Sequence, residues 1–328
     1  MPLHEQEKRE FCMKILITGA AGDIGTRLVK IFNKRSDVDL FTTALTSLHY
    51  ESSSIHKVFD VRNNDFIQWV EKIKPEVIIH LASIIQLPEN MTTEEAHDID
   101  VKATEQLLEA AVKVAVKKFV ITSSGAAYGY WKDSADWLTE DMPVRGNDDY
   151  FYSSHKRQVE EIMAKYHQQH PELKQVVLRP GTVLGPNFHN PITDMFSKKI
   201  ISGIAGSESP FVIIWVDDLV EYLIEAALTN VEGVFNVAGD GTLSLRNIAK
   251  RLNKFYVPIP PNFLRFMLSI LKPLGLSQYG PEQVKFIEFR PVLSNTKIKA
   301  VFKHQPHKTT AQAFEAFLNE TDKEYVKS

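Results

Sequence analysis

The sequence contains one cysteine, Cys12, among its 328 residues, so no disulfide can form within the chain. It also has no run of 18 apolar residues, the length of a membrane span, because Arg265, Lys272 and Pro273 interrupt its most apolar segment, residues 263–276. The first ten residues carry mixed charges and lack the apolar stretch of a signal peptide. These absences predict a cytoplasmic protein without a membrane span.

Two further absences concern partners. The 38 basic and 41 acidic residues give a net charge of −3, so no basic excess points to nucleic acid. The 11 histidines form no His-Glu-x-x-His motif, and there is neither a cysteine pair nor a calcium loop, so we expect no metal. With 44% hydrophobic and 24% charged residues, the composition is that of a globular protein.

Short apolar runs alternate with helical patterns along the first half of the chain. Strands are predicted at residues 13–18, 38–44, 76–81, 118–123 and 175–178, and again at 211–214 and 233–237. Helices are predicted at residues 66–73, 94–115, 150–168, 217–229 and 244–254. Continuous apolar strands separated by helices predict an α/β fold, a Rossmann-type doubly wound parallel sheet covered on both faces.

The domain organisation follows from where this pattern weakens. Residues 1–11 are expected to form a poorly ordered tail, and residues 12–180 a dinucleotide-binding domain. Proline and glycine become frequent beyond residue 180, which predicts a smaller C-terminal lobe for substrate in residues 181–328. Segments at about 211–240 are expected to return to the first domain.

A glycine-rich turn, Gly19-Ala-Ala-Gly22-Asp-Ile-Gly25, joins the first strand to a helix. At such a junction Gly19 permits a tight turn, Gly22 lets a pyrophosphate approach the backbone, and Gly25 allows close packing of helix on strand. The N-terminus of the helix adds free N–H groups and the positive end of its dipole. The position of the motif, within a βαβ pattern, predicts a dinucleotide site.

The Gly-x-x-Gly-x-x-Gly spacing resembles that of the short-chain dehydrogenase/reductase superfamily. Later motifs follow its extended branch, the NAD-dependent epimerase/dehydratase group: Asp60-Val61, His80-Leu81-Ala82, Ser123 to Gly129, Tyr152 to Lys156, Arg179 to Pro186, and Trp215 to Asp218. The resemblance covers residues 13–320. It implies an NAD(P)-dependent enzyme and says little about the substrate.

Three residues are implied as catalytic. Tyr152 and Lys156 are four residues apart and therefore share a helix face. By the resemblance, Tyr152 exchanges a proton with the substrate oxygen, and Lys156 lowers the pKa of that phenol and binds the nicotinamide ribose. Ser124 is implied to hydrogen-bond the same oxygen; Ser123 is its alternative. His155 is expected to point away from this face.

The residues implied to contact NAD or NADP lie at the carboxyl ends of the strands and in the glycine turn. They are Gly19, Gly22, Asp23, Ile24, Gly25, Thr43, Asp60, Val61, Leu81, Ala82, Thr122, Tyr152, Lys156, Pro180 and Val183. The acid that usually marks NAD at the end of the second strand is missing, and no arginine follows for a 2′-phosphate, so the choice of cofactor stays open. Asp100 stands where the family has asparagine.

The preferred function is hydride transfer at a secondary alcohol or ketone carbon. A nucleotide-sugar 4-epimerase or dehydratase is the alternative, less favoured because no arginine precedes Trp215 to hold a pyrophosphate; a cofactor-binding regulatory protein is a third. The apolar stretch from Phe263 to Leu271 fits core or dimer packing, or a wall for a hydrophobic substrate. The family also implies a homodimer formed by helices 94–115 and 150–168.

Overall fold

The computed structural model describes residues 12–186, 188, 190–277 and 280–321, so the predicted tail at 1–11 lies outside the described residues. Seven parallel strands form the central sheet in the order β10-β6-β5-β4-β1-β2-β3. Their bounds are Met13–Thr18 (β1), Val38–Ala44 (β2), Ile55–Val58 (β3), Val77–His80 (β4), Lys118–Thr122 (β5), Lys174–Pro180 (β6) and Gly233–Val237 (β10). The predicted doubly wound parallel sheet is confirmed.

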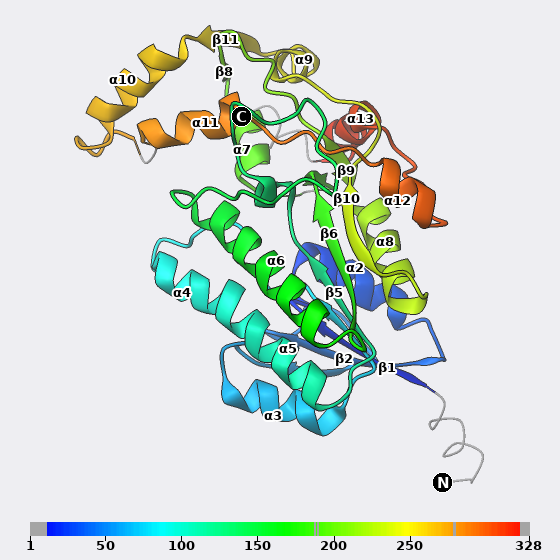
Figure 1. Ribbon diagram of the computed structural model, residues 1–328. Coiled ribbons are helices and arrows are strands. Elements are labelled where there is room, and N and C mark those ends of the chain that lie inside the picture. The colour runs from blue at the N-terminus through cyan, green and yellow to red at the C-terminus, as the bar shows by residue number, and fades with distance from the viewer. Residues whose placement is uncertain (1–11, 187, 189, 278–279, 322–328) are drawn as a thin grey trace, which may run out of the picture.

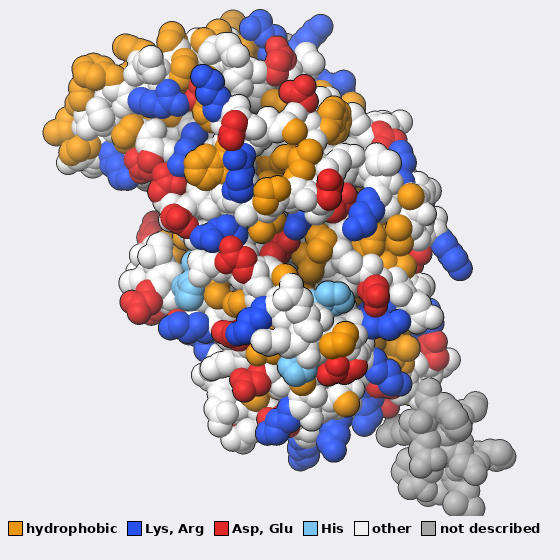
Figure 2. All heavy atoms as spheres, in the orientation of Figure 1, with side chains coloured by type: hydrophobic (Ala, Val, Ile, Leu, Met, Phe, Trp, Pro, Cys, Tyr) orange, Lys and Arg blue, Asp and Glu red, His pale blue; other side chains and the backbone are white. Residues whose placement is uncertain are grey.

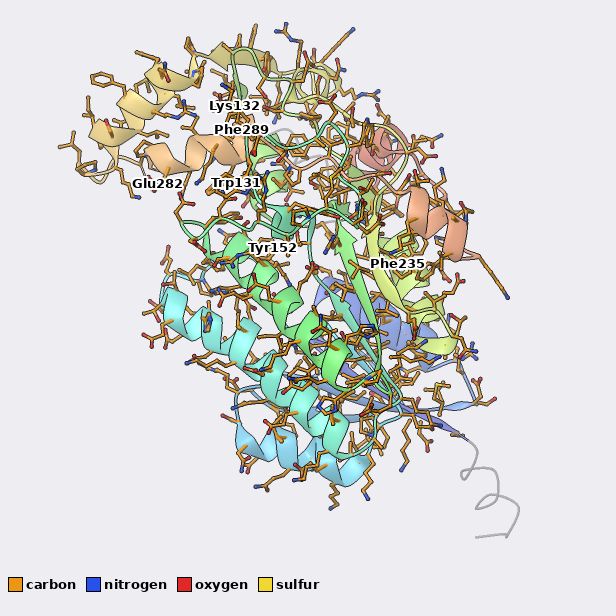
Figure 3. The ribbon with its side chains drawn as sticks, in the orientation of Figure 1. Trp131, Lys132, Tyr152, Phe235, Glu282 and Phe289 are labelled. Carbon is orange, nitrogen blue, oxygen red and sulfur yellow. The ribbon has the colours of Figure 1, made fainter. Side chains whose placement is uncertain are left out.

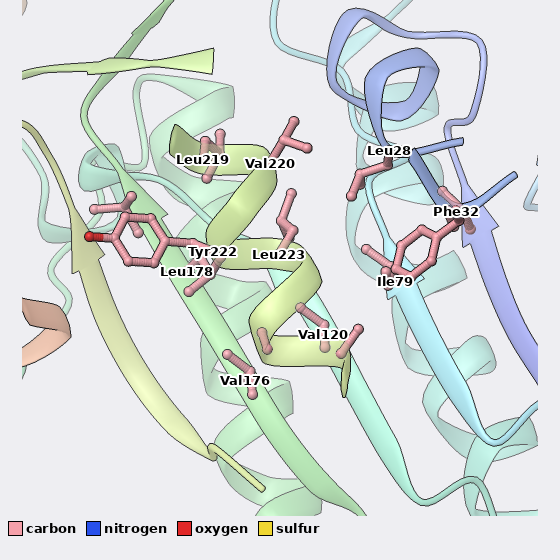
Figure 4. Packing of buried hydrophobic residues seen from close by; sticks show 14 of the residues in the cluster. Leu28, Phe32, Ile79, Val120, Val176, Leu178, Leu219, Val220, Tyr222 and Leu223 are labelled. Atoms are coloured by element: carbon pink, nitrogen blue, oxygen red, sulfur yellow. The ribbon is translucent and has the colours of Figure 1, made fainter. Parts of the chain in front are cut away.

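The strands alternate their side chains between two hydrophobic cores because successive residues of a strand point to opposite faces. In β1, Ile15 and Ile17 enter the core under α2 (Asp23–Phe32) and α8 (Val216–Leu228), shown in Figure 4. Leu16 enters the other core. The sheet is thus covered on both faces, as its continuous apolar strands require.

Helices α3, α5 and α6 cover the second face and lie side by side in Figure 1. Their bounds, with the segments that lead into α5, are Asn64–Ile73 (α3), Thr93–His97 (α4), Asp98–Lys102 (η1, a π-helix), Ala103–Lys113 (α5) and Phe151–Gln169 (α6). The long helix expected at 94–115 therefore contains a π-helical turn. Such turns often occur at functional sites, and this one carries Asp100.

The C-terminal lobe is built from short elements around its own core, which includes Trp215 and Phe314. Strand β7 (Thr182–Leu184) pairs with β9 (Ile213–Trp215), and β8 (Ile200–Ile204) pairs with β11 (Phe255–Ile259). Its helices are α7 (Pro191–Ser197), α9 (Leu245–Arg251), α10 (Pro261–Leu271), η3 (Pro281–Val284), α11 (Lys285–Glu288), α12 (Thr296–Val301) and α13 (Thr310–Glu320).

Two expectations for the later chain differ from the structure. The strand expected at 211–214 begins at Ile213, since Phe211 instead forms an isolated antiparallel bridge with Leu243. The apolar helix α10 is not core, because none of its residues is buried and Phe263, Phe266 and Ile270 face solvent. Figure 2 shows apolar side chains gathered over this helix. None of the helices within the described residues is long and apolar enough to cross a membrane.

Candidate active site

The glycine turn lies at the carboxyl edge of the sheet, between two neighbouring strands. Thr18, the last residue of β1, pairs with Thr43 of β2 and with His80 of β4. The Thr18 hydroxyl accepts hydrogen bonds from the backbone N–H groups of Leu81 (3.1 Å) and Ala82 (3.2 Å). This edge, where the chain leaves parallel strands, is where open α/β sheets bind ligands.

Each glycine of the turn has its own steric reason. Gly19 has a positive φ of 68°, and a Cβ there would lie 2.9 Å from the backbone of Leu81 and Ala82. A Cβ at Gly25 would lie 2.3 Å from the Gly19 carbonyl oxygen, so α2 packs against the turn only with glycine there. At Gly22 a Cβ would meet nothing closer than 3.4 Å, and the residue is exposed. Space is therefore left in front of Gly22, at the N-terminus of α2, and helix N-termini are positions where anions can bind.

Gly22→Val is expected to abolish binding of NAD and NADP without unfolding the chain. The backbone at Gly22, with φ −75° and ψ 169°, is one that valine adopts readily, so the free energy of unfolding should change by less than about 0.5 kcal/mol. Isothermal titration of the two dinucleotides, beside circular dichroism, measures both effects. Unchanged affinity in the folded variant would remove the pyrophosphate from this turn.

Other residues implied to contact a cofactor lie around the same edge of the sheet, and they differ in their burial and in their polar contacts. Thr43 Oγ1 is buried without a hydrogen-bond partner among the described residues. Asp60 forms an ion pair with Arg62 (2.6 Å), which holds the pKa of the Asp60 carboxyl below its usual value. Pro180 ends β6 and Val183 lies in β7. His80, by contrast, is a structural residue whose ring contacts the Thr18 and Thr104 hydroxyls.

The structure brings Ser124, Tyr152 and Lys156 together. Tyr152 lies in the first turn of α6, at the end of the helix that faces the C-terminal lobe (Figure 3), close enough to Ser124 for that hydroxyl to influence the Tyr152 pKa. Lys156 Nζ lies 5.6 Å from the centroid of the Tyr152 ring and donates to Ser83 Oγ (3.0 Å) and the Thr122 carbonyl (3.1 Å). The arrangement provides a phenol, a hydroxyl and an ammonium group around one point.

Ser124 is better placed for this role than Ser123. The Ser123 hydroxyl is buried and donates to Glu160 Oε1 (2.5 Å), which turns it away from Tyr152. Glu160 in turn forms a buried ion pair with Arg179 (2.5 Å), whose guanidinium also donates to the Tyr128 hydroxyl (2.6 Å). This network, which the sequence motifs did not predict, fixes the backbone that carries Ser124.

The electrostatics of Tyr152 differ from the expectation drawn from the family. Burial raises the pKa of Tyr152 to about 12, although the Ser124 hydrogen bond acts in the opposite direction. Burial also lowers the pKa of Lys156. Desolvation disfavours the charged form of both groups, so in the protein without ligands burial outweighs the lowering of the tyrosine pKa that the family resemblance implies. Tyr152 is a protonated phenol at neutral pH.

Asp100 and His155 form a second buried pair beside the site. Asp100 Oδ2 contacts His155 Nδ1 (2.9 Å), and Oδ1 accepts a hydrogen bond from the Ile84 N–H (2.8 Å). His155 therefore points away from the face shared by Tyr152 and Lys156, as expected from its position in the sequence. Asp100, which stands where the family has asparagine, binds His155 through a carboxylate. The amide of an asparagine could make the same contact but would carry no charge.

The structure adds Arg290, which no motif indicated. Its Cζ lies 3.9 Å from the centroid of the Phe211 ring, and it is close enough to Tyr130 and Tyr150 for these tyrosines, when ionised, to raise its pKa. The Tyr150 ring lies 6.2 Å from that of Tyr152, so Arg290 belongs to the surroundings of the catalytic candidates. Only the fold brings it there, because Phe211 and Arg290 lie in distant parts of the sequence.

Residues 15–238 match the family described as the NAD dependent epimerase/dehydratase family, so the chain belongs to this family of nicotinamide-dependent enzymes. It is 30% identical over 234 residues to a UDP-glucose 4-epimerase of Mycolicibacterium smegmatis, covering 65% of this chain and 73% of that one. It is 24% identical over 292 residues to an N-acetyl-alpha-D-glucosaminyl-diphospho-ditrans,octacis-undecaprenol 4-epimerase of Escherichia coli O157:H7, covering 84% and 85%. The solved UDP-glucose 4-epimerase of Thermus thermophilus, a complex with NAD, superposes with a TM-score of 0.71 at 21% identity, covering 94% and 98%.

Proposed function

We propose that this enzyme is an NAD-dependent 4-epimerase of a sugar carried on a diphosphate, with Tyr152, Ser124 and Lys156 as its catalytic residues. The sequence alone favoured net redox chemistry because no arginine precedes Trp215. Arg290 is the observation that changes this preference. Relatives that act on sugar diphosphates support the proposal, and solved relatives with NAD support NAD over NADP.

Arg290 has the properties of an anion-binding group. It forms no ion pair or hydrogen bond among the described residues that would neutralise it, and burial lowers its pKa. Taking a guanidinium out of water costs free energy unless a negative group compensates it. A diphosphate supplies that charge and matches the planar donors of arginine.

The three catalytic candidates fit transient oxidation of a sugar hydroxyl. A bound nicotinamide dinucleotide supplies the hydride acceptor. Ser124 and Tyr152 lie where two hydroxyls can hold one substrate oxygen, and Tyr152 exchanges its proton with that oxygen. The positive charge of Lys156 favours the phenolate once substrate has entered.

The decisive measurement separates epimerisation from net oxidation. With UDP-glucose or UDP-N-acetylglucosamine, the enzyme should form the 4-epimer, seen by NMR, while steady-state NADH absorbance stays flat. With simple secondary alcohols and NAD it should release no NADH. Stoichiometric NADH release from an alcohol, without epimer formation, would instead favour the oxidoreductase function.

Arg290→Met is expected to weaken UDP binding by roughly 10- to 100-fold, the worth of one or two charge-assisted hydrogen bonds. NAD affinity should stay unchanged, because Arg290 lies in the C-terminal lobe. Arg246→Met is the matched control, since Arg246 also stacks on an aromatic ring, Tyr256, at 5.0 Å. If titration shows equal UDP affinity for Arg290→Met and the native enzyme, the diphosphate is not held there.

A lipid-linked sugar diphosphate is a second candidate, favoured by α10. This helix exposes Phe263, Phe266 and Ile270, and its Arg265 borders a cavity of about 310 Å³ lined also by Trp131. Apolar side chains exposed beside a candidate site suit a polyprenyl chain. Phe266→Asp should then lower turnover of undecaprenyl-diphospho-N-acetylglucosamine and spare that of UDP-N-acetylglucosamine; equal effects on both would exclude it.

A further inference from the structure

A second cluster of polar groups lies on the opposite face of the sheet from Tyr152. Asp218 occupies the first turn of α8, and the segment before α13 carries His304 and His307. Asp218 Oδ1 lies 3.1 Å from His304 Nε2 and 2.7 Å from His307 Nδ1. One ligand atom from each residue lies within 4.8 Å of the other two.

The hydrogen bonds of this cluster leave two buried oxygens unused. Asp218 is 1% exposed, and its Oδ1 also accepts the His307 backbone N–H (3.0 Å), yet Oδ2 has no partner among the described residues. One helical turn away, the Tyr222 hydroxyl (Figure 4) is likewise buried without a partner among the described residues, and its ring packs edge-on against His304 with the ring centroids 4.7 Å apart. A buried carboxylate oxygen without a donor is costly, and a cation that contacts both carboxylate oxygens would satisfy Oδ2 as well as Oδ1.

We propose that Asp218, His304 and His307 bind a divalent transition metal of the zinc type. Imidazole nitrogen and carboxylate oxygen are zinc ligands at about 2.0–2.2 Å, which places neighbouring ligand atoms of a tetrahedral ion about 3.3 Å apart. The observed separations of 3.1 and 2.7 Å from Asp218 Oδ1 approach this geometry. His307 is 72% exposed and leaves a path from solvent, with the fourth position open to water.

Binding changes protons but no covalent bond. Each imidazole ligates as the neutral ring through the nitrogen that faces Asp218, so its proton moves to the other ring nitrogen or to solvent. No sequence motif indicated this site, because Asp218 is 86 residues from His304. The ion would join α8, which packs on the sheet, to the segment that leads into α13.

The experiment titrates Zn²⁺ into the untagged, chelator-treated full chain by calorimetry. We expect one ion per chain and a rise in melting temperature on binding. His307→Asn and His304→Gln keep a hydrogen-bond donor beside Asp218 but lose the metal ligand. Each should weaken Zn²⁺ binding at least 10- to 100-fold, since changing even an outer partner of a metal ligand costs that much.

His170→Asn is the matched control, because His170 forms a histidine–carboxylate pair with Glu172 (3.3 Å) and belongs to no three-residue cluster found among the described residues. It should bind Zn²⁺ like the native chain. His307 is exposed, so His307→Asn keeps the test valid if His304→Gln misfolds. No saturable binding to the native chain, or native affinity in folded His307→Asn, would overturn the site and leave a carboxylate hydrogen-bonded by two histidines.

Discussion

Tyr152→Phe is expected to reduce turnover by roughly 10²- to 10⁴-fold, the usual worth of a positioned acid or base. The substitution removes one hydroxyl and little volume, and the nearby Ser124 hydroxyl keeps the Ala126 N–H as its partner, because Ser124 is the N-cap of η2 (Gly125–Tyr128). Stability and NAD affinity should therefore change little. The measurement is the rate of 4-epimer formation at saturating UDP-sugar.

Two further variants test how the roles are divided. Ser124→Ala should lower turnover while NAD affinity stays nearly unchanged. Lys156→Ala should harm turnover and NAD binding together, because its ammonium lies between the Tyr152 ring and the Thr122 carbonyl at the sheet edge. Full activity of Tyr152→Phe would disprove the proposed mechanism even though the fold stands.

The raised pKa of Tyr152 gives this prediction a pH signature. A folded-state pKa of about 12, above the ordinary value of 10, means that the phenol stays protonated as pH rises through 10. The difference in tyrosinate absorbance between the native chain and Tyr152→Phe, measured without ligands, should stay near zero at pH 10 and rise only toward pH 12. A difference that titrates below pH 10 would show that Lys156 outweighs burial.

The sequence predicted the parts of the site that local pattern encodes. The glycine turn and the Tyr152–Lys156 spacing depend on residues a few positions apart, so strand and helix periodicity were enough to place them. Arg290 could not be predicted, because its position depends on packing against Phe211, from a distant part of the chain. The same holds for Glu160. Its charge alone suggests an exposed position, and only the fold shows that it is buried in an ion pair with Arg179 of β6.

Apolar composition was equally ambiguous without packing. The helix from Pro261 to Leu271 has the composition of core, and yet it lies on the surface, because η3 packs against only part of it and none of its residues is buried. The direction of the Tyr152 pKa was also beyond the sequence, since it depends on how much water the folded chain removes. Residue spacing predicts which side chains lie close together, whereas burial in the folded chain determines the direction of the Tyr152 pKa shift.

Arg179→Met is expected to lower the free energy of unfolding by about 3–5 kcal/mol, the cost of breaking a buried ion pair by removing one partner. Arg179 forms two hydrogen bonds from Nε and one from Nη2 to the Glu160 carboxylate, at 2.5 to 3.0 Å, and both side chains are buried. Methionine fills a similar volume but leaves the carboxylate with only the Ser123 hydroxyl among the described residues. Turnover should fall as well, because the network fixes the backbone next to Ser124.

Urea unfolding with an unchanged m-value measures this loss of stability. The control comes from α6, the helix that carries Glu160. Lys165 of α6 forms an exposed ion pair with Glu105 at 3.4 Å, so Lys165→Ala should cost no more than about 1 kcal/mol. Adding Glu160→Gln to Arg179→Met removes the stranded charge and should recover part of the stability. If the single variant loses no more than Lys165→Ala does, the buried pair is not what stabilises the strand end, and the position of Ser124 must depend on the packing of β5 and η2 alone.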